Sequence, residues 1–131
     1  MIALDTNVLV RFLVEDDLEQ SKKARHLIQR IVSSGNTCFL SDIIICEMIW
    51  VMDSCYKIEK IEIVRMVHQL LASPHVTFAT SDRIASALAA YETGPGDFSD
   101  YLIREHAIEA GCEFVSTFDK ALFKEAGFKP L

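Results

Sequence analysis

Short apolar runs alternate with longer segments of helical periodicity along this chain. Four runs are too short for helices and are predicted to be strands, at residues 1–4, 37–40, 76–79 and 113–117. Between them, apolar residues recur at the spacing of one helix face. The predicted helices span residues 7–14, 17–33, 42–56, 59–72, 81–91, 98–110 and 120–126, and residues 128–131 are a candidate terminal strand.

This alternation of strands and helices predicts an α/β fold with a parallel sheet and helices on both of its faces. The sequence has no repeat, low-complexity tract or linker, and its strongest break is Gly94-Pro95-Gly96. We therefore expect residues 1–131 to form a single domain. Ligands of such sheets bind beyond the carboxyl ends of the strands, which is where candidate site residues are sought.

The charge balance limits the ways in which this chain can contact nucleic acid. It has 19 acidic and 13 basic residues, a net charge of −6. This argues against binding through a large phosphate-neutralising patch, but not against a nuclease whose bound cations contact the phosphate. Only Lys22, Lys23 and Arg25 are closely grouped basic residues, and we interpret them as a solvated helix face.

The cysteines and the apolar runs indicate a cytoplasmic protein. Cys38, Cys46, Cys55 and Cys112 form no CxxC pair and no zinc-ligand spacing, so we interpret all four as reduced packing residues. No apolar run approaches the roughly 20 residues that span a bilayer. The opening MIALDTN lacks the basic region of a secretion signal.

Two predicted strands end in an aspartate. Residues 1–4 are followed by Asp5, and the strand that ends at Thr117 is followed by Phe118 and Asp119. Taken singly, each aspartate is better explained as a turn or helix-cap residue. Two parallel strands that carry carboxylates to the same sheet edge favour a functional site.

Glu47 is the only charged residue in the apolar segment 43–52. A helix that is apolar on nearly every side is expected to be buried, which places Glu47 in or beside the core. A buried ionised carboxylate without a partner costs several kcal/mol at least. We therefore expect Glu47 to be protonated, paired with a cation such as an arginine, or close to a metal.

Two further acids, Asp97 and Asp100, follow the Gly-Pro-Gly break at the start of a predicted helix. Asp97 at the cap and Asp100 at the third position is a normal helix start. Because residues three apart face the same way, however, their charges repel, and one cap needs only one carboxylate. The additional acid favours a bound cation.

Together these acids form an oxygen-only set without His or Cys, which suits Mg²⁺ or Mn²⁺. Mg²⁺ usually takes only one or two carboxylates directly, so some of the acids are expected to act through water. Such sites support phosphoryl transfer or phosphodiester hydrolysis. The set comprises Asp5, Glu47, Asp97, Asp100 and Asp119.

The order and spacing of these motifs resemble the PIN-domain family and, within it, the VapC toxins. The resemblance covers nearly the whole chain. It rests on Asp5-Thr6-Asn7 followed by Val8-Leu9-Val10-Arg11, on Glu47, on Asp100, and on Gly111-Cys112 before Thr117-Phe118-Asp119.

The resemblance implies an α/β/α sandwich, a Mg²⁺- or Mn²⁺-dependent ribonuclease, a homodimer, and an inhibitory VapB-type antitoxin. By position, Asp5 and Asp100 correspond to the main metal ligands, Asp119 and Glu47 complete the acidic quartet, and Asp97 matches an additional acid. Thr6, Asn7 and Thr117 would be polar supports of the carboxylates. The sequence departs from the family's usual small residues after Asp100 at Tyr101, Arg104 and His106.

Three other functions remain open at this stage. The same fold without activity would be a dimeric binding module, and a housekeeping PIN nuclease would have the same acids without a toxin role. A phospho-acceptor receiver domain also clusters aspartates at strand ends, but its third strand normally ends in Asp. Here that strand ends in Thr80-Ser81. We therefore favour the nuclease.

Overall fold

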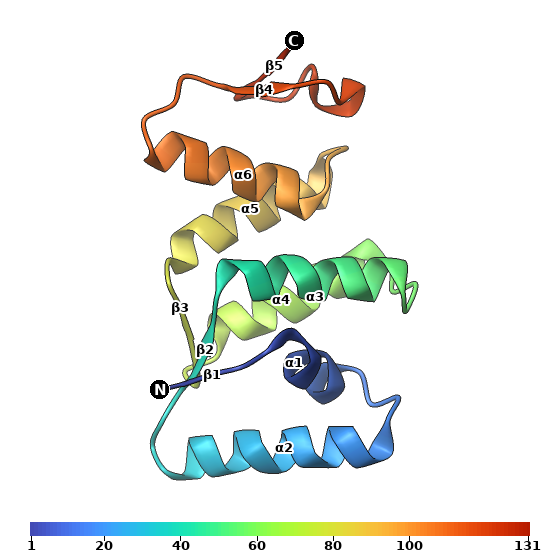
Figure 1. Cartoon of the computed structure of the whole chain (residues 1–131), viewed down its shortest axis with the longest axis vertical. Coiled ribbons are helices and arrows are strands. Elements are labelled where there is room, and N and C mark those ends of the chain that lie inside the picture. The colour runs from blue at the N-terminus through green and yellow to red at the C-terminus, as the bar shows by residue number, and fades with distance from the viewer. The chain divides into compact units, whose positions relative to one another are not determined.

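Helices and strands alternate in the order that the apolar pattern predicts (Figure 1). The computed structural model describes all residues, 1–131. The predicted ends agree with the observed ones to within two residues, except that the last predicted helix is a shorter 3₁₀ turn. The elements are β1 (Ile2–Ala3), α1 (Thr6–Leu13), α2 (Leu18–Ser33), β2 (Cys38–Leu40), α3 (Asp42–Ser54), α4 (Lys60–Ala72), β3 (Val76–Phe78), α5 (Ser81–Thr93), α6 (Phe98–Glu109), β4 (Val115–Thr117), η1 (Lys120–Leu122) and β5 (Phe128–Pro130).

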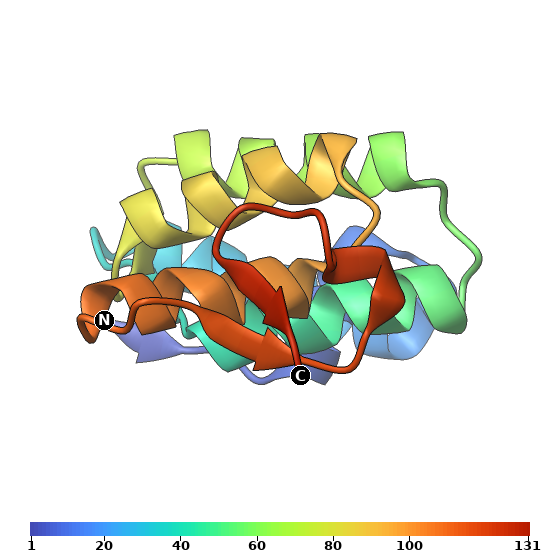
Figure 2. The same ribbon diagram turned by 90° about the horizontal axis from the view of Figure 1, so that it is seen from above.

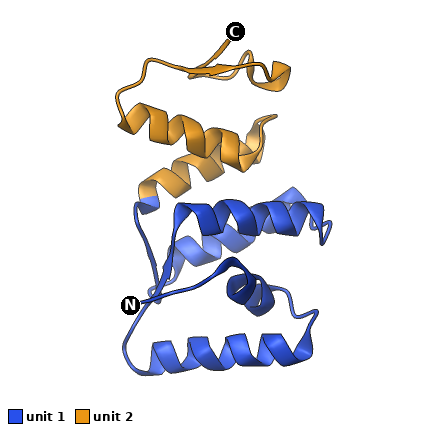
Figure 3. Cartoon of the chain, viewed as in Figure 1, with its two compact units in different colours: residues 1–81 blue, residues 82–131 orange.

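These elements form two compact units, residues 1–81 and 82–131 (Figure 3). The first unit contains a parallel sheet of three strands in the order β1-β2-β3, with Ile2 beside Cys38 and Cys38 beside Val76. Helices α1 and α2 connect β1 to β2, and α3 and α4 connect β2 to β3, as parallel pairing requires. The predicted parallel pairing is confirmed for these three strands.

The core of the first unit contains side chains from the sheet and from all four helices. Helix α1 packs against both α2 and α3, and α3 packs against α4 (Figure 1). Hydroxyl and carboxylate caps fix where helices begin: Asp17 accepts from the Gln20 N–H at 3.0 Å, and Ser41 accepts from the Ile44 N–H at 3.4 Å. The buried apolar residues include Leu9, Leu40, Ile45, Met48, Met52, Ile63 and Val67.

Helix α3 corrects one expectation, that its apolar segment is buried on nearly every side. One stripe is buried, but Ile43 and Trp50 on the other side are 68% and 64% exposed. Glu47 lies on that exposed side and is itself exposed, so its carboxylate needs no buried partner. An apolar sequence shows that a helix can pack, but where apolar residues occupy every side it does not show which side is used. The buried stripe consists of Ile45, Met48, Ile49 and Met52.

In the second unit, α5 and α6 precede a parallel pair of strands, β4 and β5, which lie side by side in Figure 2 and are joined in the chain through η1. Val115 lies beside Phe128 in this pair. The rings of Tyr91 and Phe98 meet edge to face, with centroids 6.1 Å apart, at the turn that joins the two helices. Parallel pairing is therefore confirmed here too, including the candidate terminal strand. The expectation that the strands before Asp5 and Asp119 share one sheet is wrong, because β4 pairs with β5 in a separate sheet from β1.

Tyr101 explains the Gly-Pro-Gly break. Its fully buried ring lies so close to the preceding turn that a Cβ atom on Gly94 would be 1.9 Å from the tyrosine hydroxyl oxygen. A Cβ on Gly96 would be 2.7 Å from Leu122. The Gly96 N–H donates to the Tyr101 hydroxyl at 3.1 Å, and the hydroxyl donates to Glu125 at 2.6 Å. The glycines are thus required by close packing around the ring.

The predicted state of the cysteines is correct and their predicted burial only partly so. All four are free thiols, but Cys55 and Cys112 are exposed, whereas Cys38 is buried and Cys46 is half-buried. Cys55 follows the last turn of α3 and Cys112 follows the end of α6, where the chain returns to the surface. As expected from the short apolar runs, none of the helices combines the length and the hydrophobicity needed to cross a bilayer.

Candidate active site

The first unit holds two of the predicted acids on either side of Thr6. Asp5 caps α1, and its Oδ1 accepts a hydrogen bond from the Thr6 backbone N–H at 2.9 Å. The buried Thr6 hydroxyl donates to Oε2 of Glu47 at 2.7 Å, although Glu47 lies 41 positions later in the chain. Thr6 therefore links the end of β1 to the exposed side of α3, and it fixes two carboxylates at once.

Both carboxylates keep an oxygen that no protein group occupies. Asp5 uses Oδ1 for its cap and Glu47 uses Oε2 for the threonine, which leaves Oδ2 and Oε1 open. Both side chains are exposed, so these oxygens can meet a solvated cation. Burial and the negative charges of Asp42 and Glu47 raise the pKa of the nearby Cys46 thiol to about 11. Without a bound metal, that thiol is therefore protonated near neutral pH.

The Thr6–Glu47 hydrogen bond should be measurable as a coupling. We expect Thr6→Val and Glu47→Ala to show a coupling energy of about 1 kcal/mol in a double-mutant cycle. Either single variant already removes the hydrogen bond to the charged acceptor, so the double variant does not lose it a second time. Urea unfolding of the two single variants and the double variant measures it. Strictly additive losses would contradict a role for Thr6 in holding Glu47.

The second unit holds the other three acids. Asp97 occupies the N-cap of α6, and Oδ2 of Asp100 accepts from the Asp97 backbone N–H at 2.8 Å. This is the cap arrangement expected from the sequence, and it again uses only one carboxylate oxygen of Asp100. Asp97 is exposed and Asp100 is half-buried.

Asp119 follows β4 and begins η1. Its Oδ1 accepts from the Ala121 N–H at 3.0 Å, and its own N–H donates to the Thr117 hydroxyl at 3.0 Å. Thr117 thus supports the backbone that carries Asp119, as Thr6 supports Glu47. The two strand-end aspartates are therefore both caps, and both leave Oδ2 open.

The three acids of the second unit interact electrostatically. Partial burial is the largest cause that raises the pKa of Asp100, and the negative charges of Asp97 and Asp119 raise it further. The hydrogen bond from the Asp97 N–H opposes this rise. Charges that disfavour one another in this way would be relieved by a divalent cation. The oxygen donors and their mutual repulsion both fit Mg²⁺ or Mn²⁺.

Neither unit by itself brings three His, Cys, Asp or Glu side chains together as a metal site. Thr6 joins two acids in the first unit, and three acids interact electrostatically in the second. The assignment of all five as metal-binding or catalytic residues stays a prediction.

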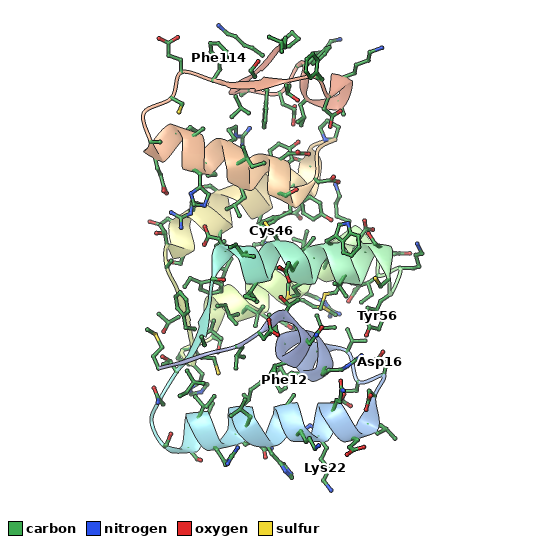
Figure 4. All side chains as sticks on the ribbon, in the orientation of Figure 1. Phe12, Asp16, Lys22, Cys46, Tyr56 and Phe114 are labelled. Atoms are coloured by element: carbon green, nitrogen blue, oxygen red, sulfur yellow. The ribbon has the colours of Figure 1, made fainter.

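A polar network around Arg11 was not predicted from the sequence. The Arg11 guanidinium donates to Gln20, Asp16 and Tyr56, each at 2.8 Å, and the Tyr56 hydroxyl donates to Asp16 at 2.8 Å; Figure 4 labels Asp16 and Tyr56. The hydrogen bond from Tyr56 is the largest cause that lowers the pKa of Asp16. These residues come from α1, α2 and the segments that follow α1 and α3. No local motif signals their contact.

The structure also explains two of the residues that depart from the PIN pattern. Arg104 lies over the Tyr101 ring, 5.0 Å from its centroid, and donates to the Ala126 carbonyl at 2.9 Å. Both residues therefore stabilise the second unit. His106 is exposed near the end of α6.

Comparison with known proteins agrees with this picture. The PIN domain family model matches residues 2–129, which span both units. A VapC ribonuclease of Aquifex aeolicus (strain VF5) is 27% identical over 129 residues, which is 98% of this chain and 94% of the relative. The chain therefore belongs to the PIN domain family. This confirms the resemblance, including that to VapC proteins, and the predicted α/β fold class.

Proposed function

We propose that this protein is a metal-dependent endoribonuclease and the toxin of a toxin–antitoxin pair. The observation that carries the proposal is the whole-chain PIN match together with acids at all five motif positions. Likeness to a protein named VapC ribonuclease supports RNA as the substrate. The match across both units supports residues 1–131 acting as one domain.

In this proposal, Asp5, Asp97, Asp100 and Asp119 bind Mg²⁺ or Mn²⁺, and Glu47 completes the catalytic acids. A bound divalent cation supplies an activated water and stabilises the leaving oxygen. The chain's own groups hold the acids in place. Thr6 positions Glu47, and Thr117 positions the backbone of Asp119. Asn7, exposed beside Asp5, is proposed as a further polar support.

Cleavage of RNA should require a divalent cation. We expect the purified protein to degrade single-stranded RNA with Mg²⁺ or Mn²⁺ and to stop when EDTA is present, because open carboxylate oxygens alone activate no water. Gel electrophoresis of labelled RNA with and without each cation measures this. Cleavage that continues undiminished in EDTA would contradict the proposal, and intact RNA under every cation would favour the inactive binding module.

The proposed partners are inferred from the similarity to the VapC ribonuclease of Aquifex aeolicus. A VapB-type antitoxin would present a basic side chain to the acids, because an arginine pairs with carboxylates through two hydrogen bonds and competes with a cation. We also propose a homodimer in the cytoplasm. Size measurement of the purified chain, alone and after co-expression with the candidate antitoxin, tests both forms of assembly.

A further inference from the structure

Three hollows in the surface of the first unit meet along α2, and none of their lining residues is acidic. One lies between α1 and α2 and is lined by Asn7, Arg11 and Lys23 among others. The second lies on the outer side of α2 and is lined by Lys23, His26, Gln29, Arg30 and Ser33. The third includes Arg30 and Asn36. Lys23 and Arg30 each line two of the hollows, so the hollows are neighbours along α2.

The absence of acids there is unusual for this chain. Acidic residues outnumber basic ones by 19 to 13 overall. The acids nearest to α2, at positions 15, 16, 17 and 19, gather at its N-terminal end. From Lys23 onward the exposed side chains of the helix are basic or uncharged. We call Lys23, His26 and Arg30 the α2 basic face.

The side chains of this face are available to a ligand. Lys23 has one partner, Glu19 at 3.5 Å, and both side chains are more than three-quarters exposed, so this pair contributes little and separates readily. His26 and Arg30 are exposed, and their side chains form no ion pair. Figure 4 shows Lys22 on the same helix projecting away from α1.

The spacing of these three side chains suits contact with an extended polyanion. Lys23, His26 and Arg30 are three and four positions apart, so they lie along one side of α2, over about 10 Å at 1.5 Å per residue. The face continues past Arg11 to Asn7, two positions from Asp5. Arg11 is already paired with Asp16, so it extends the polar path more than it adds free charge.

We propose that the α2 basic face binds the phosphate backbone of RNA that extends from the acidic residues around Asp5. This rests on the proposed ribonuclease function and assigns a substrate-binding surface to it. The occupant is a polyanion by charge complementarity. Of the basic group Lys22, Lys23 and Arg25 that was interpreted as a solvated face, only Lys23 belongs to the α2 basic face. The contacts are to phosphates, so they add affinity without sequence preference.

Binding of RNA tests this separately from cleavage. The probe is a fluorescent single-stranded RNA of mixed sequence, bound to the full-length Asp100→Asn variant over a range of salt concentrations. Adding Lys23→Gln and Arg30→Gln should weaken binding roughly tenfold at low salt. It should also reduce the slope of log affinity against log salt by about 1.4, since each lost phosphate contact contributes about 0.7.

The matched control removes the same two charges elsewhere in the unit, as Lys57→Gln with Arg65→Gln. Both pairs are at exposed positions, and circular dichroism verifies that each variant is folded. Equal loss in both pairs would show a general charge effect and overturn the proposal. Unchanged RNA binding by Lys23→Gln/Arg30→Gln would also overturn the proposal, whether or not the wild type cleaves RNA.

Two further experiments separate this proposal from its alternatives. In the first, poly-glutamate competes with the labelled RNA; competition as strong as that of unlabelled RNA of equal charge would assign the face to an acidic protein and overturn the RNA assignment. In the wild-type background, Lys23→Gln/Arg30→Gln should raise KM for long RNA and leave cleavage of a dinucleotide unchanged. A wild type that binds RNA through this face but never cleaves it would contradict the ribonuclease and retain the binding surface.

Discussion

Asp100→Asn is expected to reduce RNA cleavage by more than about a hundredfold. Mutation of residues that only support metal ligands already lowers metal affinity or activity roughly 10–100-fold. Asparagine keeps the shape of the side chain and an oxygen that can accept from the Asp97 N–H, so the start of α6 is preserved. It removes the negative charge that a cation needs. Initial rates on labelled RNA at saturating Mn²⁺ measure the loss.

The stability of the same variant provides the first control. Asp100 is partly buried and repelled by Asp97 and Asp119, so removing its charge should leave the unfolding free energy unchanged or higher. A second control, Asp53→Asn, removes an exposed acid of α3 and should keep full activity. Asp5→Asn should match Asp100→Asn. Wild-type rates in either variant would remove that residue from the catalytic set.

Growth arrest is the second large effect that we expect. Cells expressing the wild type should stop dividing, because an uninhibited ribonuclease degrades RNA that the cell needs. Asp5→Asn and Asp100→Asn should permit normal growth without any inhibitor, and Asp53→Asn should arrest growth like the wild type. Growth curves at matched protein levels, verified by immunoblot, give the comparison.

The outcomes of this experiment separate the toxin from the housekeeping nuclease. Normal growth with abundant, folded and RNA-cleaving wild type would contradict the toxin role and leave the nuclease. Rescue of the wild type by a co-expressed VapB-type protein would support the proposed partner. Arrest by all variants, including Asp100→Asn, would point to a cause other than cleavage and contradict the proposed mechanism of toxicity.

The strands and caps could be predicted because they depend on local sequence. Short apolar runs that end in Asp5 or precede Asp119 determine both the strand and the residue that starts the next helix, and Asp97 with Asp100 is a complete helix-start signal. Asp97 and Asp119 lie close enough to Asp100 for their charges to raise its pKa, and a shared site for the three acids stays a prediction.

The side of a helix that packs could not be predicted in the same way. Glu47 was expected inside because its neighbours are apolar, yet α3 uses only one of its apolar sides and Glu47 is exposed. The network of Arg11, Asp16 and Tyr56 depends on segments that meet only after folding. Tertiary contacts of this kind leave no periodic signal in the sequence.

The packing of Tyr101 against the Gly94-Pro95-Gly96 turn has a consequence for how this protein changes over generations. A side chain at position 94 would overlap the tyrosine hydroxyl, and the same hydroxyl binds Glu125 near the C-terminus. A mutation at any one of these sites therefore alters what the others tolerate. The tyrosine, the glycines and Glu125 should be inherited together. Loss of the hydroxyl alone would not permit a side chain at position 94, because its Cβ would still lie 2.8 Å from the Ala90 carbonyl oxygen.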